Sequence, residues 1–102
     1  MVAVIQDKLD AIADLCRKYG VAQLYVFGSA TRDDFRPGSS DLDLLVDFGA
    51  MGGHAKAHAY FDLLDELEDL LEVRVDLVMV NAVKNRYIVR DIERTKMMLY
   101  AA

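Results

Sequence analysis

The sequence contains a single cysteine, a single proline and no tryptophan, and it lacks any apolar run as long as a membrane span. Cys16 is alone, so no intrachain disulfide can form, and a reducing compartment is the simplest interpretation. A spanning helix needs about 20 apolar residues, and no signal-peptide pattern opens the chain. These absences predict a cytoplasmic protein with no membrane association.

Basic residues are also scarce, with 12 Lys and Arg against 17 Asp and Glu and a net charge of −5. Tight binding to nucleic acid depends on many Lys and Arg contacts to phosphate, so this balance argues against a nucleic-acid partner. A local patch formed by some of the 12 basic residues is the alternative. Hydrophobic residues make up 54% of the 102 residues. That content predicts one compact domain over residues 1–102.

Hydrophobic periodicity predicts helices over 3–19, 57–72 and 82–94, and strands over 22–27, 42–48, 73–80 and about 97–100. Asn81 is the expected N-cap of the last helix. The apolar positions of the first and last helices are expected to face the core: Ile5, Leu9, Ile12, Cys16 and Tyr19, and Val83, Tyr87, Ile88 and Ile92. The fold class is therefore α/β (α+β), with a small mixed sheet and helices packed mainly on one face.

The chain is organised around residues 28–47, which read GSATRDDFRPGSSDLDLLVD. Gly28 and Ser29 end one apolar run, whereas Asp41 and Asp43, separated by one leucine, open the next. The turn residues between them predict two antiparallel neighbouring strands. The Gly-Ser pair and both aspartates are then expected to share one edge of the sheet.

This spacing has a chemical consequence. Side chains at i and i+2 of a strand point to the same face, about 6.5–7 Å apart, so Asp41 and Asp43 can converge on divalent cations. Gly28 allows backbone to approach a ligand, and Ser29 offers a hydroxyl and an N–H to phosphate oxygens. A short helix over 30–35 would add the positive end of its dipole. Phosphate binding beside a cation site indicates a nucleoside triphosphate.

A third acid, Asp76, lies in the alternating run Val-Arg-Val-Asp-Leu-Val. A strand–helix–strand crossover makes the strands 42–48 and 73–80 parallel, which places Asp76 level with Asp41 and Asp43. The alternative is a lone polar residue on a half-exposed strand.

Other polar residues have plainer interpretations. Asp47 shares the face of the acidic pair but is expected to be a solvated neighbour, and His54 and His58 to face solvent or a partner. The acidic side of the helix 57–72 is expected to be a wet face or to meet a basic partner. An apolar final edge strand predicts contact with another copy or with a partner.

At these residues the sequence resembles the nucleotidyltransferase superfamily related to DNA polymerase beta, and most closely its minimal nucleotidyltransferases (MNT proteins). The signature is Gly-Ser, a loop, Asp-x-Asp and a third acid on a later strand. Gly28, Ser29, Asp41, Asp43 and Asp76 match it as they stand. Ser40, Arg32 and the closing Leu-Tyr are also typical of the family.

The resemblance implies a Mg²⁺-dependent transfer of a nucleoside monophosphate, AMP from ATP, with two ions held by Asp41, Asp43 and Asp76. Gly28, Ser29, Arg32 and Ser40 would bind the nucleotide. It further implies a small helical HEPN-type partner, a toxin whose tyrosine the MNT antitoxin adenylylates. Two alternatives remain open: a non-catalytic antitoxin that neutralises its partner by contact, and transfer to a small molecule.

Overall fold

The computed structural model describes residues 2–32, 35–36 and 38–102. Within these residues four strands form one sheet, which packs with four α-helices and two 3-10 helices. In chain order the elements are α1 (Ala3–Gln6), α2 (Leu9–Lys18), β1 (Gln23–Phe27), η1 (Gly28–Thr31), β2 (Leu42–Asp47), α3 (Gly53–Leu71), β3 (Val75–Met79), η2 (Val80–Ala82), α4 (Arg86–Thr95) and β4 (Met97–Ala101).

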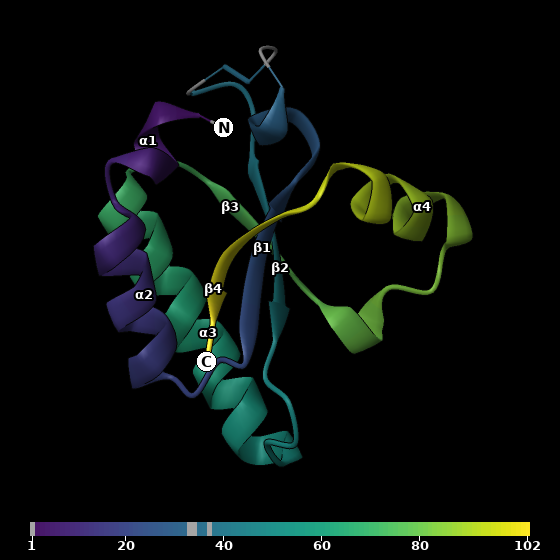
Figure 1. The fold of residues 1–102 in the computed structure, drawn as a ribbon. Helices are drawn as coiled ribbons and strands as arrows, with labels where there is room; N and C mark the ends of the chain where they lie inside the picture. The colour runs from purple at the N-terminus through teal and green to yellow at the C-terminus, as the bar shows by residue number, and fades with distance from the viewer. Residues whose placement is uncertain (1, 33–34, 37) are drawn as a thin grey trace.

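The sheet has the order β3-β2-β1-β4 and is mixed. β1 runs antiparallel to both β2 and β4, whereas β2 and β3 are parallel. The predicted antiparallel pair, the parallel crossover and the final edge strand are therefore confirmed. The chain passes from β2 to β3 through the long helix α3, which lies on one side of the sheet in Figure 1.

Helices cover the two faces of the sheet unequally, as the predicted fold class requires. Figure 1 shows α1, α2 and α3 together on one side and α4 alone on the other. Leu42, Leu44 and Val46 are buried in the main core with side chains from α1, α2 and α3. Leu45 points the other way, into a small cluster with Phe27 and Ile92 of α4. Alternation along β2 thus separates a large core from a thinly covered second face.

The predicted helix over 3–19 is wrong in one respect, because Asp7 and Lys8 interrupt it. Ile5, Ile12 and Cys16 are buried as expected, but the break moves Leu9 out of phase, and its exposed fraction is 37%. Cys16 is the predicted core residue, and burial raises the pKa of its thiol to about 12. A thiol so hard to ionise is a packing group rather than a nucleophile.

The predicted last helix begins too early. Asn81 lies in the 3-10 turn η2, and the N-cap of α4 is Asn85, whose side-chain oxygen accepts from the N–H groups of Tyr87 (2.9 Å) and Ile88 (3.4 Å). Only Ile92 of the expected inward residues on this helix is buried, whereas Tyr87 and Ile88 are 68% and 49% exposed. The four-residue shift leaves the first turn of α4 clear of the sheet.

Helix α3 begins at Gly53, before the predicted start at 57, so His54 and His58 both lie on it and both are exposed, as predicted. Its acidic side is only partly a wet face. Lys18 Nζ contacts Glu66 Oε2 at 3.1 Å, and Glu68 accepts from the Val75 N–H at 2.8 Å. These contacts fasten α3 to α2 and to the start of β3.

The helical turn that follows β1 is η1, which starts at Gly28 rather than at residue 30. The rest of the expected 30–35 helix falls partly on residues 33 and 34, and the turn proline is Pro37; all three lie outside the described residues. Within the described ranges, no helix combines the length and apolar character needed to cross a bilayer.

Candidate functional site

The candidate site lies where β1 ends and β2 and β3 begin. Asp43 is the register partner of Phe27 on one side and of Asp76 on the other. Gly28 follows Phe27 directly, so the turn into η1 lies beside the Asp43 side chain. Asp41 precedes β2 by one residue and shares the facing of Asp43. The structure thus brings together Gly28, Asp41, Asp43 and Asp76, as the sequence predicted.

Gly28 makes room for the Asp43 carboxylate. A Cβ atom built on Gly28 would lie 2.7 Å from Asp43 Oδ2, closer than real Cβ contacts allow, and the residue has a φ of +72°. Both the close approach and the backbone conformation therefore require glycine. The glycine of the Gly-Ser pair therefore both permits the turn and leaves space for the Asp43 side chain.

The other predicted nucleotide-binding residues lie in the turns that flank this centre: Ser29, Arg32 and Ser40. Ser29 is half-buried in η1, and its carbonyl accepts from the Arg32 N–H at 3.0 Å. Ser40 holds the loop instead, because its hydroxyl oxygen accepts from the Arg36 N–H at 3.1 Å. A polar hollow of about 560 Å³ adjoins Asp41 and Ser40 and extends to Arg74.

Several carboxylates lie close to that of Asp43. Burial first, and then the neighbouring carboxylates of Asp76, Asp41 and Asp91, raise its pKa to about 6, while the Arg32 guanidinium opposes the shift. Carboxylates grouped on one sheet edge repel one another and gain nothing for the fold. Such an arrangement is typical of a functional site.

The donor chemistry of this edge fits a hard divalent cation. The side chains that face it offer carboxylate oxygens, and both histidines lie in the first turns of α3, which follow the opposite end of β2. Among residues 2–32, 35–36 and 38–102, no three His, Cys, Asp or Glu side chains are already gathered closely enough to hold an ion. Asp41 and Asp76 are exposed, whereas Asp43 is half-buried and fixed beside Gly28.

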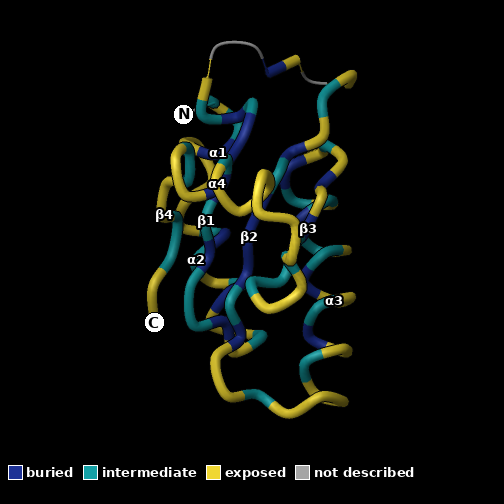
Figure 2. The backbone as a smooth tube through the Cα atoms, turned by 90° about the vertical axis from the view of Figure 1, so that its right-hand side faces the viewer, coloured by how far each residue is buried: buried dark blue, intermediate teal, exposed yellow. Residues whose placement is uncertain are grey.

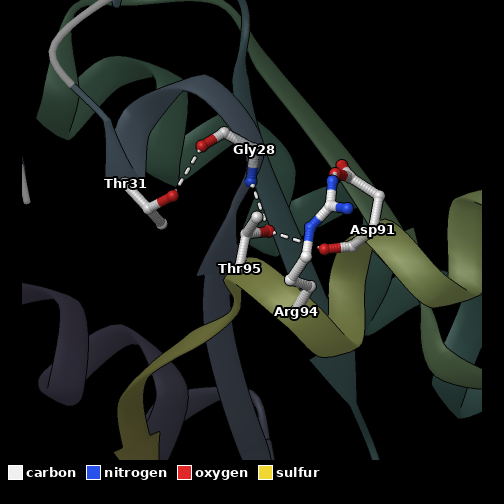
Figure 3. A network of polar contacts seen from close by, with 5 residues as sticks. All are labelled: Gly28, Thr31, Asp91, Arg94 and Thr95. Atoms are coloured by element: carbon white, nitrogen blue, oxygen red, sulfur yellow. Dashed lines mark hydrogen bonds and ion pairs between the residues drawn. The ribbon is translucent and has the colours of Figure 1, made fainter.

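Helix α4 contributes residues that the sequence did not indicate. The Gly28 N–H donates to Thr95 Oγ1 at 3.1 Å, and the Thr95 hydroxyl donates to the Asp91 carbonyl at 2.8 Å. Figure 3 shows Thr95 between Gly28 and Asp91, while Arg94 Nη2 contacts Asp91 Oδ1 at 3.1 Å. The contact between positions 28 and 95 joins distant parts of the chain, so no local spacing could have shown it.

We expect Thr95→Val to lower the free energy of unfolding by about 1–2 kcal/mol, because the buried Gly28 N–H loses its acceptor. Thr95→Ser keeps the hydroxyl and is the matched control, expected to stay within about 0.5 kcal/mol of the unchanged chain. Urea unfolding followed by circular dichroism measures both. Equal losses in the two variants would contradict the assigned hydrogen bond.

Comparison with protein families extends this picture. The model of the family described as a nucleotidyltransferase domain matches residues 10–97, which include Gly28, Ser29 and all three aspartates. A protein of Methanocaldococcus jannaschii, named as a candidate protein adenylyltransferase, is 42% identical over 79 residues, covering 78% of this chain and 76% of that protein. The protein adenylyltransferase MntA of Thermococcus cleftensis is 39% identical over 72 residues, covering 71% of this chain and 69% of the relative.

The fold is also similar to a solved toxin–antitoxin complex. The match is to a structure described as a tri-AMPylated HEPN toxin of Shewanella oneidensis in complex with its MNT antitoxin, with a TM-score of 0.67. It covers 96% of this chain and 73% of the matched chain, at 20% identity. At that identity the likeness establishes a shared fold.

Proposed function

The chain belongs to the nucleotidyltransferase domain family, and from that premise we propose that it transfers AMP from ATP to a hydroxyl group of a partner protein. The observation that carries the proposal is the register of the sheet edge, where Asp43 lies between the Gly28 turn and Asp76. Residues 1–102 act as one catalytic domain in this proposal. Because the reaction consumes ATP, we place it in the cytoplasm.

In the proposed reaction the acceptor hydroxyl oxygen forms a bond to the α-phosphorus of ATP. The bond from that phosphorus to the bridging oxygen breaks, and pyrophosphate leaves. Ser29 and the η1 turn hold the outer phosphates, with Gly28 shaping the turn and Arg32 opposing their charge. Asp76, exposed at the start of β3, accepts the proton of the hydroxyl. Ser40, whose hydroxyl oxygen accepts from the Arg36 N–H, adds to the nucleotide contacts beside Asp41.

In this proposal two magnesium ions would be held by Asp41, Asp43 and Asp76, since carboxylate oxygens suit that cation. When bound, the metal neutralises charge that develops on the phosphates. Asp43 is the fixed member of this set, because Gly28 and the β1 and β3 neighbours confine it. A bound cation would offset the repulsion between the Asp43 carboxylate and those of Asp76 and Asp41.

The proposed acceptor is a tyrosine of a small helical HEPN-type toxin, which would make this chain its antitoxin. Support comes from the similarity to MntA and from the fold shared with an MNT antitoxin bound to an AMPylated HEPN toxin. The alternative is neutralisation by contact alone. The clustered carboxylates favour catalysis, because contact with a partner has no need of them.

The test is intact-mass spectrometry of the native complex. The tagged chain is expressed in its own host, and co-purifying protein is incubated with MgATP beside an Asp41→Asn/Asp43→Asn control. We expect a partner to gain the mass of AMP only with the unmutated chain. A partner that binds both chains, carries no AMP as isolated and gains none would replace the proposal with the contact-only antitoxin.

A further inference from the structure

The segment around α4 carries a charge opposite to that of the chain as a whole. Residues 84–96 contain five of the 12 basic residues (Lys84, Arg86, Arg90, Arg94 and Lys96) but only two acids (Asp91 and Glu93), in a chain whose net charge is −5. The excess is local and lies on the thinly covered face of the sheet (Figure 1). Its location sets it apart from the acidic surface of α3.

Both acids of this segment are already paired. Arg94 Nη2 lies 3.1 Å from Asp91 Oδ1, and Lys96 Nζ lies 3.0 Å from Glu93 Oε1. The other three cations have no acidic partner within the described residues, and Arg86 instead lies over the Tyr87 ring, 5.7 Å from its centroid. The positive charge of the first half of α4 is therefore uncompensated.

Exposed apolar groups accompany these cations. Tyr87, Ile88 and Val89 are 68%, 49% and 39% exposed, and Figure 2 draws most of α4 in the colour of exposed residues. Residues three or four apart share a helix face, so Tyr87, Arg90 and Arg94 form an outer stripe. By the same spacing Ile88 aligns with Asp91 and Thr95, the two residues of the Gly28 network.

The helix is joined directly to the candidate site. The Gly28 N–H, at the turn beside Asp43, donates to Thr95 Oγ1 near the C-terminal end of α4. A protein docked on the outer side of α4 would therefore lie on the helix whose C-terminal end adjoins the Gly28 turn and Asp43, where an acceptor hydroxyl has to arrive.

We propose that the exposed face of α4, formed by Arg86, Tyr87, Ile88 and Arg90, is the docking surface for an acidic, partly apolar surface of the acceptor protein. This inference rests on the proposed function for the identity of that protein. Uncompensated arginines select negative charge, and the aromatic and aliphatic side chains between them suit a protein surface. Nucleic acid would use the charge but not the aliphatic groups, and the overall charge of −5 opposes it.

The docking step is tested without nucleotide or metal, so its outcome is separate from that of catalysis. A soluble random copolymer of glutamate and tyrosine is titrated into the ¹⁵N-labelled chain, with a lysine–tyrosine copolymer and an oligouridine as comparison probes. We expect the acidic copolymer to shift amide resonances of residues 84–96 selectively. Absent shifts, shifts centred elsewhere, or stronger binding of oligouridine at α4 would overturn the proposal. Concentration-dependent shifts of α4 and α3 without any probe would assign the surface to a second copy.

A pair of charge reversals sharpens the test. Arg90→Glu and Lys8→Glu change the net charge equally, and both side chains are exposed. We expect Arg90→Glu to weaken binding of the acidic copolymer about tenfold, and Lys8→Glu to leave it within about twofold. Equal weakening would indicate bulk charge and overturn the proposal. If Arg90→Glu left AMP transfer to a native acceptor unchanged, the docking proposal would fail while the proposed function would stand. Selective docking without any AMP transfer would overturn only the proposed function.

Discussion

Replacing Asp43 with asparagine is expected to lower AMP transfer severely and at the same time to stabilise the fold at pH 8. The variant keeps the shape of the side chain but removes the charge that faces Asp76 and Asp41. Without that charge the proposed cation site loses its fixed carboxylate, and we expect a loss on the order of 10³-fold in kcat/KM. Transfer is measured as AMP incorporated into the acceptor with MgATP.

The gain in stability follows from the direction of the pKa shift. The Asp43 pKa is raised from 3.8 to about 6, so between these values the native state binds more protons than the unfolded state. The stability of the unmutated chain therefore falls as the pH rises through this window and stays low above it. Asparagine does not titrate, so the variant should exceed the unmutated chain by about 1 kcal/mol at pH 8, after solvent screening of this half-buried group, with no such gain below pH 3.8.

Asp47→Asn is the matched control, because Asp47 lies on the same strand and face as Asp43. Its Oδ1 accepts from the Gly49 N–H at 2.8 Å, a bond that the asparagine oxygen can keep. We expect transfer within about twofold of the unmutated chain and no gain in stability at pH 8. Urea unfolding at several pH values measures the second point. An Asp43→Asn chain that stays active, or that is less stable at pH 8, would refute the role assigned to this carboxylate.

The parts of the fold that the sequence predicted are those that local patterns determine. Turn residues between two apolar runs predict an antiparallel pair, and the crossover through 57–72 predicts a parallel one. Those two rules place Asp43 between the Gly28 turn and Asp76, and the observed register agrees. The arrangement of these residues at the sheet edge could therefore be predicted from the sequence.

The start of α4 was mispredicted because the chain offers two asparagines, four residues apart, that can each cap a helix. Asn85 prevails over Asn81 in the fold, where Ile92 packs against Phe27 and Leu45. That choice depends on tertiary packing, which periodicity does not contain. The same limit concealed Thr95, whose hydroxyl oxygen accepts from a residue 67 positions away, and Asp91, whose carbonyl accepts from that hydroxyl.

The role of Gly28 was predicted only in part, because its steric demand comes from a neighbouring strand. The sequence identified a glycine where backbone approaches a ligand, but the nearest obstacle to a Cβ is Asp43 Oδ2. This closeness makes Gly28→Ala informative. The added methyl group must displace the carboxylate, since the two atoms cannot remain 2.7 Å apart.

We therefore expect Gly28→Ala to lower AMP transfer about 100-fold, the loss typical of a reactive group misplaced by about 1 Å. Its fold should lose about 1–2 kcal/mol, because alanine is strained at a φ of +72°. Gly38→Ala provides the control, since Gly38 has a φ of +87° and no heavy atom within 4 Å of a built Cβ. It should lose similar stability yet keep most of its transfer activity when assayed well below its melting temperature. If activity fell equally in both variants, the effect would come from backbone strain, and the steric link between Gly28 and Asp43 would have no part in catalysis.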